Sequence, residues 1–222
     1  IGGETLAKEV IVGALEQGKA VVTANKAVIA LHGNELSRQR LRFEAAVAGA
    51  IPIIQALQHG LVANQFSALS GIINGTCNYM LSAMENEGVD FDAILARAQA
   101  LGYAEADPTF DVDGIDAAHK LTILMALAFD TDFEFDKVYV EGIRALTPID
   151  ISYAAELGYR IKHLGILRSS PDGIEARVHP TLVPHSELMA HVNGVLNAVQ
   201  VVSDAAGKTL FSGPGAGGGA TA

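Results

Sequence analysis

The residues most capable of chemistry in this sequence are five carboxylates and one lysine, all crowded between positions 101 and 120. They are Glu105, Asp107, Asp111, Asp113, Asp116 and Lys120. Asp116 and Lys120 are four residues apart, so on a helix they lie on one face, one turn apart. A lysine beside carboxylates at the start of an apolar helix can act as a proton donor whose acidity depends on burial and on neighbouring charge.

Two simpler interpretations of this acidic segment stay open. It can be a solvated loop with an ordinary surface ion pair, which contributes little. It can also bind calcium, but an EF-hand needs glycine at its sixth position, and Gly114 comes too soon after Asp111. The helix expected over 115–129 is almost wholly apolar, so most of its sides must be covered. That burial favours a functional lysine, and mutually repelling carboxylates favour a cationic ligand such as a substrate ammonium group.

Other motifs carry less information. The seven histidines show no zinc-ligand spacing, and Cys77 is the only cysteine, so a structural zinc site is not expected. Neither a Gly-x-Ser-x-Gly elbow nor a Walker loop is present. The run 213–218 matches G-x-G-x-x-G, but no helix or acidic ribose partner can follow it in four residues. It is interpreted either as a loop that lets a backbone approach a ligand or as a flexible tail.

The composition excludes several classes of protein. Of 222 residues, 50% are hydrophobic and 18% are charged, which excludes overall disorder. A net charge of -10 argues against nucleic acid and anionic membrane as partners. No apolar run reaches the roughly eighteen residues of a membrane span. A single cysteine fits a cytoplasmic setting, and both chain ends are interpreted as cuts through a longer protein.

The spacing of hydrophobic residues predicts the helices and strands that hold these residues. In the first 54 residues it predicts a helix, a buried strand, a second helix and an extended run, which indicates an α/β domain with a parallel sheet. These elements are expected over 4–17, 19–23, 27–40 and 42–54. Further helices are expected over 53–59, 77–86, 90–101, 115–129 and 147–157, and strands over 65–73, 138–143, 159–168 and 175–182.

Several of these stretches together resemble the homoserine dehydrogenase family. The segments that carry the resemblance follow the family's order along essentially the whole chain. They are TANK (23–26), FEAAVAGAIP (43–52), SGIINGTCNY (70–79), the acidic segment 101–120, and GPGAG (213–217).

The resemblance implies an oxidoreductase that interconverts L-homoserine and L-aspartate 4-semialdehyde with NAD or NADP, in threonine, methionine and isoleucine biosynthesis. By position, Lys120 matches the family's catalytic proton donor. Lys26 matches the lysine that reaches cofactor and substrate from the nucleotide domain, and Gly217 matches a late cofactor contact. The positions matched to substrate binding are Gly75, Thr76, Tyr103, Glu105, Asp111 and Asp116.

The resemblance also implies a domain organisation and a metal site. Residues 1–43 correspond to the C-terminal part of a Rossmann-like domain, and 53–184 to a catalytic α+β domain with a mixed sheet and helices on one face. Residues 44–52 and 185–217 correspond to a dimerisation region, so a homodimer is expected, and 218–222 to a truncated tail. Backbone carbonyls in the loop around Glu44, Val47, Gly49 and Ile51 are expected to hold a monovalent cation, usually sodium.

Two other functions remain as alternatives. One is a non-catalytic module that binds an amino acid or mediates oligomerisation, in which the acidic loop only captures an ammonium group. The other is a different NAD(P)-dependent oxidoreductase acting on amino acids. The family's glycine-rich phosphate loop is absent from this sequence, so most contacts to the dinucleotide are expected from residues outside it.

Overall fold

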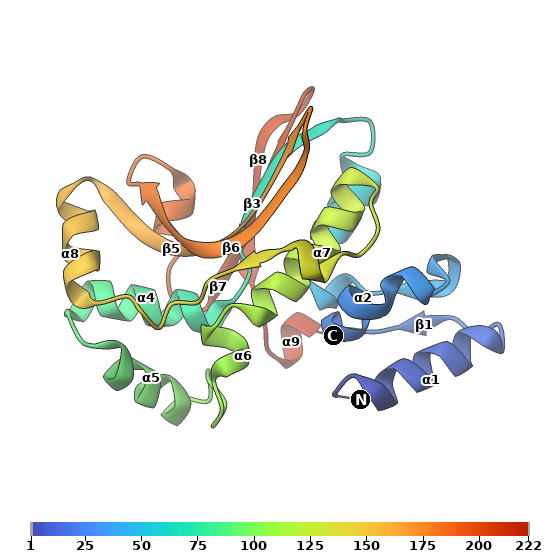
Figure 1. Ribbon diagram of the computed structural model, residues 1–222, viewed down its shortest axis with the longest axis horizontal. Helices are drawn as coiled ribbons and strands as arrows, with labels where there is room; N and C mark the ends of the chain where they lie inside the picture. Colours follow the sequence, from blue (N-terminus) through green and yellow to red (C-terminus); the bar gives the residue numbers. More distant parts are fainter. Residues whose placement is uncertain (1, 222) are drawn as a thin grey trace.

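A computed structural model describes residues 2–221 of the chain (Figure 1). Ile1 and Ala222, the outermost residues of the predicted N-terminal part and of the predicted tail, lie outside the described residues. The described chain forms a six-stranded sheet with helices packed on it and a small two-stranded sheet near its start. This arrangement confirms the predicted α/β class with a mixed sheet.

The N-terminal part alternates helices and strands as predicted, but its strands are very short. Its elements are α1 (Thr5–Glu16), β1 (Val21–Val22), α2 (Lys26–His32) and β2 (Leu41–Arg42). β1 and β2 pair in parallel. The prediction of a buried strand over 19–23 was wrong, because only two residues pair and the Val22 side chain is 84% exposed.

Two further predictions for this part were wrong in extent. The helix expected over 27–40 ends at His32 and gives way to two 3-10 turns, η1 (Gly33–Glu35) and η2 (Arg38–Arg40). The extended run expected over 42–54 is mostly a compact loop with a 3-10 turn, η3 (Glu44–Ala46). Ala48 and Gly49 both have positive φ there, which breaks any strand.

The large sheet has the strand order β4-β6-β5-β3-β7-β8. All neighbours are antiparallel except β4 and β6, so the sheet is mixed. The strands predicted over 65–73, 138–143, 159–168 and 175–182 are all present, whereas no separate strands were predicted for β7 and β8. The strands are β3 (Phe66–Ile72), β4 (Tyr139–Val140), β5 (Tyr159–Ser170), β6 (Gly173–Pro184), β7 (Leu196–Ser203) and β8 (Gly207–Pro214).

The two faces of this sheet are covered differently. Side chains alternate along a strand, so Leu69, Leu167 and Val199 share one face, where they pack with Leu121 in the largest hydrophobic cluster. The α-helices lie on that side (Figure 1). The other face is covered by a short 3-10 segment, η6 (Leu188–His191), which packs in a smaller cluster. The predicted placement of α-helices on one face therefore agrees with the structure.

The remaining helices largely follow their sequence signals. α7 (Ile115–Phe129) matches its predicted bounds, and α8 (Pro148–Glu156) begins with a capping box between Thr147 and Asp150. α4 (Gly75–Glu87) and α5 (Phe91–Ala100) also agree, although Asp90 makes no side-chain cap bond. The helix predicted over 53–59 is α3 (Ile53–Gln55) followed by the π-helical turn η4 (Ala56–Gly60).

Two short helices were not predicted. α6 (Thr109–Val112) lies within the segment interpreted as an acidic loop, and α9 (Gly218–Thr221) occupies the predicted tail. Along residues 2–221, no helix combines the length and the apolar character that crossing a bilayer requires.

Candidate active site

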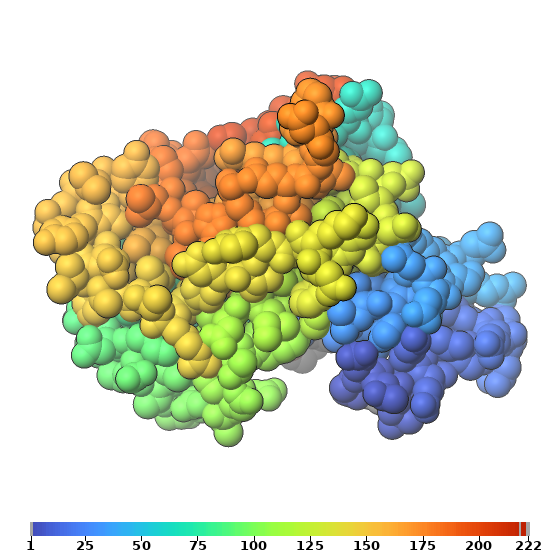
Figure 2. All heavy atoms as spheres, in the orientation of Figure 1, coloured from blue at the N-terminus to red at the C-terminus, as the bar shows by residue number. Residues whose placement is uncertain are grey.

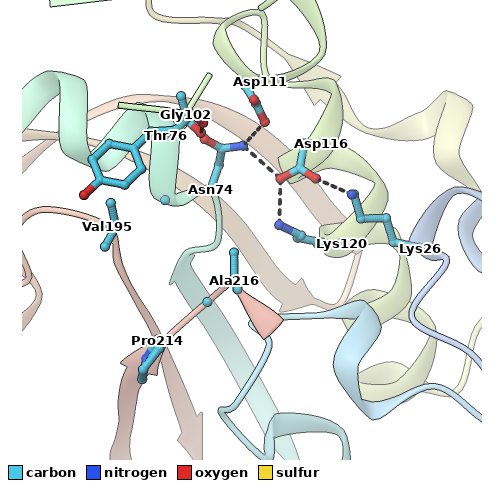
Figure 3. Close-up of a pocket in the computed structure, with 14 residues that line it drawn as sticks. Lys26, Asn74, Thr76, Gly102, Asp111, Asp116, Lys120, Val195, Pro214 and Ala216 are labelled. Atoms are coloured by element: carbon cyan, nitrogen blue, oxygen red, sulfur yellow. Dashed lines mark hydrogen bonds and ion pairs between the residues drawn. The ribbon is translucent and has the colours of Figure 1, made fainter. Parts of the chain in front are cut away.

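A cleft of about 410 Å³ lies where the N-terminal part meets the helices beneath the large sheet (Figure 3). Its walls come from the starts of α2 and α4, the loop after α5, the helices α6 and α7, and the segment after β8. The lining residues are Lys26, Asn74, Gly75, Thr76, Gly102, Tyr103, Asp111, Asp116, Lys120, Val195, Pro214, Gly215, Ala216 and Gly217.

Asp116 lies between two lysines in this cleft (Figure 3). Its Oδ2 accepts a hydrogen bond from Lys120 Nζ at 2.7 Å, and its Oδ1 is 3.0 Å from Lys26 Nζ. Lys120 Nζ also donates to the carbonyl oxygen of Ile73 at 2.8 Å. The four-residue spacing on α7 thus brings Asp116 and Lys120 together as predicted, and α2 delivers Lys26 from the N-terminal part.

Asn74 organises the acidic side of the cleft and was not among the predicted site residues. Its side-chain oxygen accepts a hydrogen bond from the Cys77 N–H at 2.8 Å and caps α4. Its Nδ2 donates to Asp111 at 2.7 Å and to Asp116 at 2.9 Å. The sequence signal was available, because an Asn-Gly-Thr run between a strand and a helix is typical of an N-cap. Its second role as a carboxylate donor depends on the tertiary fold.

The two carboxylates that line the cleft differ in their acidity. Burial disfavours the charge on Asp116, but Lys120, Lys26 and Asn74 outweigh burial and lower the pKa of Asp116 to about 2. Burial raises the pKa of Asp111, which the hydrogen bond from Asn74 opposes and the charge of Asp116 reinforces. The site therefore holds one firmly ionised carboxylate and a second that takes up a proton more readily.

The acidic segment divides between the cleft and the surface. Glu105, predicted to bind substrate, is exposed and does not line the cleft, and within the described part of the chain its carboxylate has no partner. Asp107 is also exposed, and Asp113 pairs with Arg144. The structure thus does not bring Glu105 to the site, because the chain turns at Gly102, which has a positive φ, and only Gly102 and Tyr103 of this loop line the cleft. The solvated-loop interpretation fits these three residues.

The start of α4 and Tyr103 form the wall opposite the lysines. Gly75 and Thr76 line the cleft as predicted, and the Thr76 hydroxyl donates to the Tyr103 carbonyl oxygen at 2.7 Å. The Tyr103 ring packs edge-on against Tyr79 at 4.9 Å between centroids. Backbone N–H groups at a helix start favour an anion. This wall therefore suits a carboxylate better than a cation.

The glycine-rich run at the end of β8 forms another wall of the cleft. A Cβ on Gly215 would lie 2.1 Å from Asn197 Cγ, so this position has no room for a side chain. Gly217, predicted to contact the cofactor, also lines the cleft. Of the two interpretations of GPGAG, close approach to a ligand fits this placement.

A second cavity opens beside the first, on the side of the N-terminal part. It has a volume of about 760 Å³ and is lined by the end of β1, the start of α2 and the residues before α1. Figure 2 shows the surface hollowed between the N-terminal residues and the segment before α7. Lys26 lines both cavities, and Phe110 and His119 close the second one. Burial lowers the pKa of His119, and its Nδ1 has no partner among the described residues.

The predicted cation loop lies directly behind the glycine-rich wall. Its Glu44 carboxylate accepts hydrogen bonds from the Ile54 and Gln55 N–H groups at 2.9 and 3.0 Å, so it caps α3. A Cβ on Gly49 would lie 2.6 Å from the Gly215 carbonyl oxygen. Val47 and Ile51 are buried. The Glu44 carboxylate is thus engaged, and only backbone carbonyls of this loop remain as donors for a hard cation.

Comparisons with known proteins agree on one family. Residues 52–222 match the family model for homoserine dehydrogenase. The chain is 60% identical to homoserine dehydrogenase from Pseudomonas aeruginosa over 98% of its own length and 51% of that protein. The crystal structure of a homoserine dehydrogenase from Thiobacillus denitrificans covers the whole chain at 56% identity with a TM-score of 0.98, over 53% of its own length.

A more distant structure is informative about ligands. A hyperthermophilic archaeal homoserine dehydrogenase in complex with NADPH matches the whole chain at 27% identity with a TM-score of 0.84, over 66% of its own length. The chain spans about half the length of the curated relatives it matches.

Proposed function

This chain belongs to the homoserine dehydrogenase family, and we propose that the full-length protein interconverts L-homoserine and L-aspartate 4-semialdehyde with NAD or NADP. The observation that carries the proposal is the Lys26–Asp116–Lys120 arrangement inside the cleft, with Asp116 within 3.0 Å of both ammonium groups. Such a site offers a proton donor to a carbonyl oxygen. It also offers groups of both charge signs to the ammonium and carboxylate groups of an amino acid.

Lys120 is the proposed proton donor. An ammonium group has three N–H donors, and Lys120 uses two of them on Asp116 and the Ile73 carbonyl. The third can donate to the aldehyde oxygen as negative charge builds there during reduction. In the oxidation direction, the neutral amine takes the proton from the substrate hydroxyl. The bound nicotinamide cofactor supplies or accepts the hydride.

The remaining cleft residues are proposed to hold the amino-acid end of the substrate. The N–H groups of Gly75 and Thr76 at the start of α4 suit the α-carboxylate. Asp111 and Asp116 suit the α-ammonium group, since both are acidic and lie on one side of the cleft. Tyr103 closes the far wall. Glu105 is proposed as a further substrate ligand, which requires residues 104–107 to move inward when substrate binds.

The second cavity is the proposed position of the nicotinamide end of the cofactor. Its lining by the carboxyl end of β1 and the start of α2 is where α/β sheets bind dinucleotides. Lys26 borders both cavities and would contact cofactor and substrate, and Gly217 would contact the cofactor from the opposite wall. Most other contacts to the dinucleotide would come from outside this chain.

A monovalent cation such as sodium is proposed at the loop around Glu44, Val47, Gly49 and Ile51. The positive φ of Ala48 and Gly49 turns consecutive carbonyls, and the loop packs against the Gly215 carbonyl. A cation held there would fix the glycine-rich wall of the cleft.

We also propose a homodimer formed through 44–52 and 185–217, with 1–43 and 53–184 as nucleotide and catalytic domains. The apolar side chains of Leu188, Val195 and Leu196 are 68%, 41% and 40% exposed, and β8 is an edge strand. Light scattering of the full-length protein tests this assembly. We further propose that the full-length protein acts in the cytoplasm, in threonine, methionine and isoleucine biosynthesis.

The decisive experiment is steady-state oxidation of L-homoserine by the full-length protein and its Lys120→Ala variant, followed through reduction of NAD or NADP. Turnover should fall by about 10²- to 10⁴-fold, the usual contribution of a positioned proton-transfer group. Homoserine affinity, measured by calorimetry, should stay within a few-fold. Lys137→Ala is the matched control, because Lys137 pairs with Glu134 on the surface.

The outcomes separate the alternatives. Homoserine binding without turnover in the unmodified protein would favour a binding module. Faster oxidation of another amino acid would favour a different oxidoreductase. Undiminished turnover in Lys120→Ala would reject the assignment of the proton donor.

A further inference from the structure

Lys162 on β5 is one of the most buried side chains of the molecule, although it is a lysine. It is 1% exposed and has no ion-pair partner among the described residues. Its Nζ donates to the Val192 carbonyl at 2.7 Å, the Asn193 side-chain oxygen at 3.0 Å and the Asn78 side-chain oxygen at 3.3 Å. All three protons of the ammonium group therefore have neutral acceptors.

These acceptors belong to, or hold, one short segment of chain. The segment 192–196 runs from the end of η6 to Leu196, the first residue of β7, and residues 192–195 lie outside any helix or strand. Asn78, buried in the second turn of α4, donates from Nδ2 to the Val192 carbonyl at 3.2 Å and to the Leu196 carbonyl at 3.1 Å. The Gly194 N–H donates to the Ser82 hydroxyl at 3.2 Å. Lys162 and α4 thus fix both ends and the middle of the segment.

The same segment forms part of the catalytic cleft. Val195 lines it, and a Cβ on Gly75 would lie 2.8 Å from the Val195 carbonyl oxygen. Asn197, the next residue along, fills the space beneath Gly215. A small shift of 192–197 would therefore displace the start of α4 on one side and the glycine-rich wall on the other.

A lysine buried among neutral groups is a costly way to hold a loop. Replacing buried charge by a well-packed apolar side chain is often neutral or stabilising. The charge thus does not stabilise the fold, and its three directed hydrogen bonds supply what an apolar residue lacks, a fixed position for one backbone carbonyl and two side-chain oxygens.

We propose that Lys162 is a positioning residue, which acts through Asn78 and the segment 192–196 to hold the cleft wall at Gly75 and Val195 in the geometry that the amino-acid substrate requires. This inference rests on the proposed function for its kinetic consequence. Its structural part, the ordering of 192–197, stands independently. Lys162 itself does not line the cleft and has no chemical role.

The test uses the full-length protein and its Lys162→Met variant. The KM for L-homoserine should rise about tenfold, the factor that corresponds to losing one such hydrogen bond, while the KM for the cofactor stays within about twofold. Amides of 192–197 should exchange hydrogen faster in the variant, with no loss of thermal stability. A purely structural lysine would instead lower stability and leave the ratio of the two KM values unchanged.

Arg160→Met is the matched control. Arg160 lies two residues away on β5, and it pairs with Glu85 at 2.9 Å and donates to the Ala190 carbonyl at 3.1 Å, outside the segment 192–196. It should leave the KM for homoserine unchanged. An equal rise in both variants, or none in folded Lys162→Met, would overturn the proposal.

Two other outcomes of these experiments also have a defined meaning. If Lys162→Met does not fold, Asn193→Ala replaces it, because Asn193 is exposed and its truncation removes one acceptor of Lys162. Unchanged KM and exchange in that variant count against the proposal. If the unmodified protein does not oxidise homoserine, the proposed function fails, and hydrogen exchange at 192–197 alone decides whether Lys162 orders the segment.

Discussion

Asp116 carries one negative charge between two ammonium groups, and its burial makes that balance energetically important. Its side chain is 5% exposed, whereas the exposed pairs at Lys137 and Lys208 are screened by water. An exposed pair contributes little, but a buried carboxylate that loses its partners is strongly destabilising. The charges in the cleft therefore depend on one another, and removing one affects the other two.

The Asp116→Asn variant should be less stable at neutral pH. The carboxylate has a pKa of about 2 when folded, against 3.8 for the ordinary group. A lowered pKa stabilises the fold above the ordinary pKa, here by about 2 kcal/mol, and this contribution is lost as the pH falls from 3.8 towards 2. Urea unfolding of both proteins should show a constant difference down to about pH 4 and a shrinking one below it. A difference independent of pH would mean that packing, not charge, is responsible.

Lys162 should make stability depend on pH in the alkaline range. Burial lowers its pKa from 10.5 to about 8, with Glu85 opposing and Arg160 reinforcing the shift. The unfolded chain binds more protons between these two values, so the stability of the unmodified protein should rise across that interval. The advantage of Lys162→Met should be largest below pH 8 and shrink towards 10.5, which unfolding of both proteins at several alkaline pH values measures. Other groups titrate equally in both and cancel.

At the residue scale, local spacing predicted only part of the site. Asp116 and Lys120 were predictable because a helix fixes the relation of residues four apart. Glu105 was not distinguishable from Asp111 in sequence, since a turn at Gly102 decides which carboxylate faces the cleft. Asn197 and Lys162 carry no sequence signal, because their roles depend on burial between distant strands.

At the scale of elements, prediction succeeded where local signals agreed. α7 has an apolar run that begins after Gly114, and α8 has Thr147, Pro148 and Asp150 in the order of a capping box. The prediction of an extended run over 42–54 was wrong because the small and apolar residues there pack as a loop against the glycine-rich wall. That loop is shaped by contacts with 214–215, which lie far away in sequence.

The end of β8 offers a direct test of how elements shape the cleft. Gly215→Ala should lower stability by about 1–3 kcal/mol and reduce turnover, because its Cβ would overlap the buried Asn197 side chain. Gly213→Ala, two residues earlier, is the matched control, since its Cβ would meet only Ile51 Cγ1 at an ordinary 3.5 Å. Unfolding midpoints and homoserine turnover of both variants compare the two positions. Equal effects would show that the contact with Asn197 is unimportant.

At the scale of the whole molecule, the site depends on how the N-terminal part docks on α7. Val28 and Ile29 of α2 are buried in the cluster that includes α7. Asn34 and Phe133 exchange two hydrogen bonds, at 2.9 and 3.2 Å. Lys26, at the start of α2, reaches Asp116 only while this docking holds. The predicted boundary between nucleotide and catalytic parts therefore runs through the site.

Gly33→Ala should weaken catalysis from a position outside the cleft. A Cβ on Gly33 would lie 2.5 Å from the Phe133 ring, so the N-terminal part must shift away from α7 or the ring must move. A shift of α2 would lengthen the 3.0 Å contact between Lys26 and Asp116. We therefore expect turnover of the full-length protein to fall by about tenfold or more, because small misplacements of catalytic groups are costly.

The control for this docking is Gly13→Ala on α1, where a Cβ would meet nothing within 4 Å. Since alanine favours a helix over glycine, this variant should gain up to about 1 kcal/mol of stability in the isolated chain. Its turnover in the full-length protein should stay unchanged. If Gly33→Ala kept full turnover while losing stability, the Phe133 ring would have absorbed the clash, and the distance between Lys26 and Asp116 would not depend on the docking of α2.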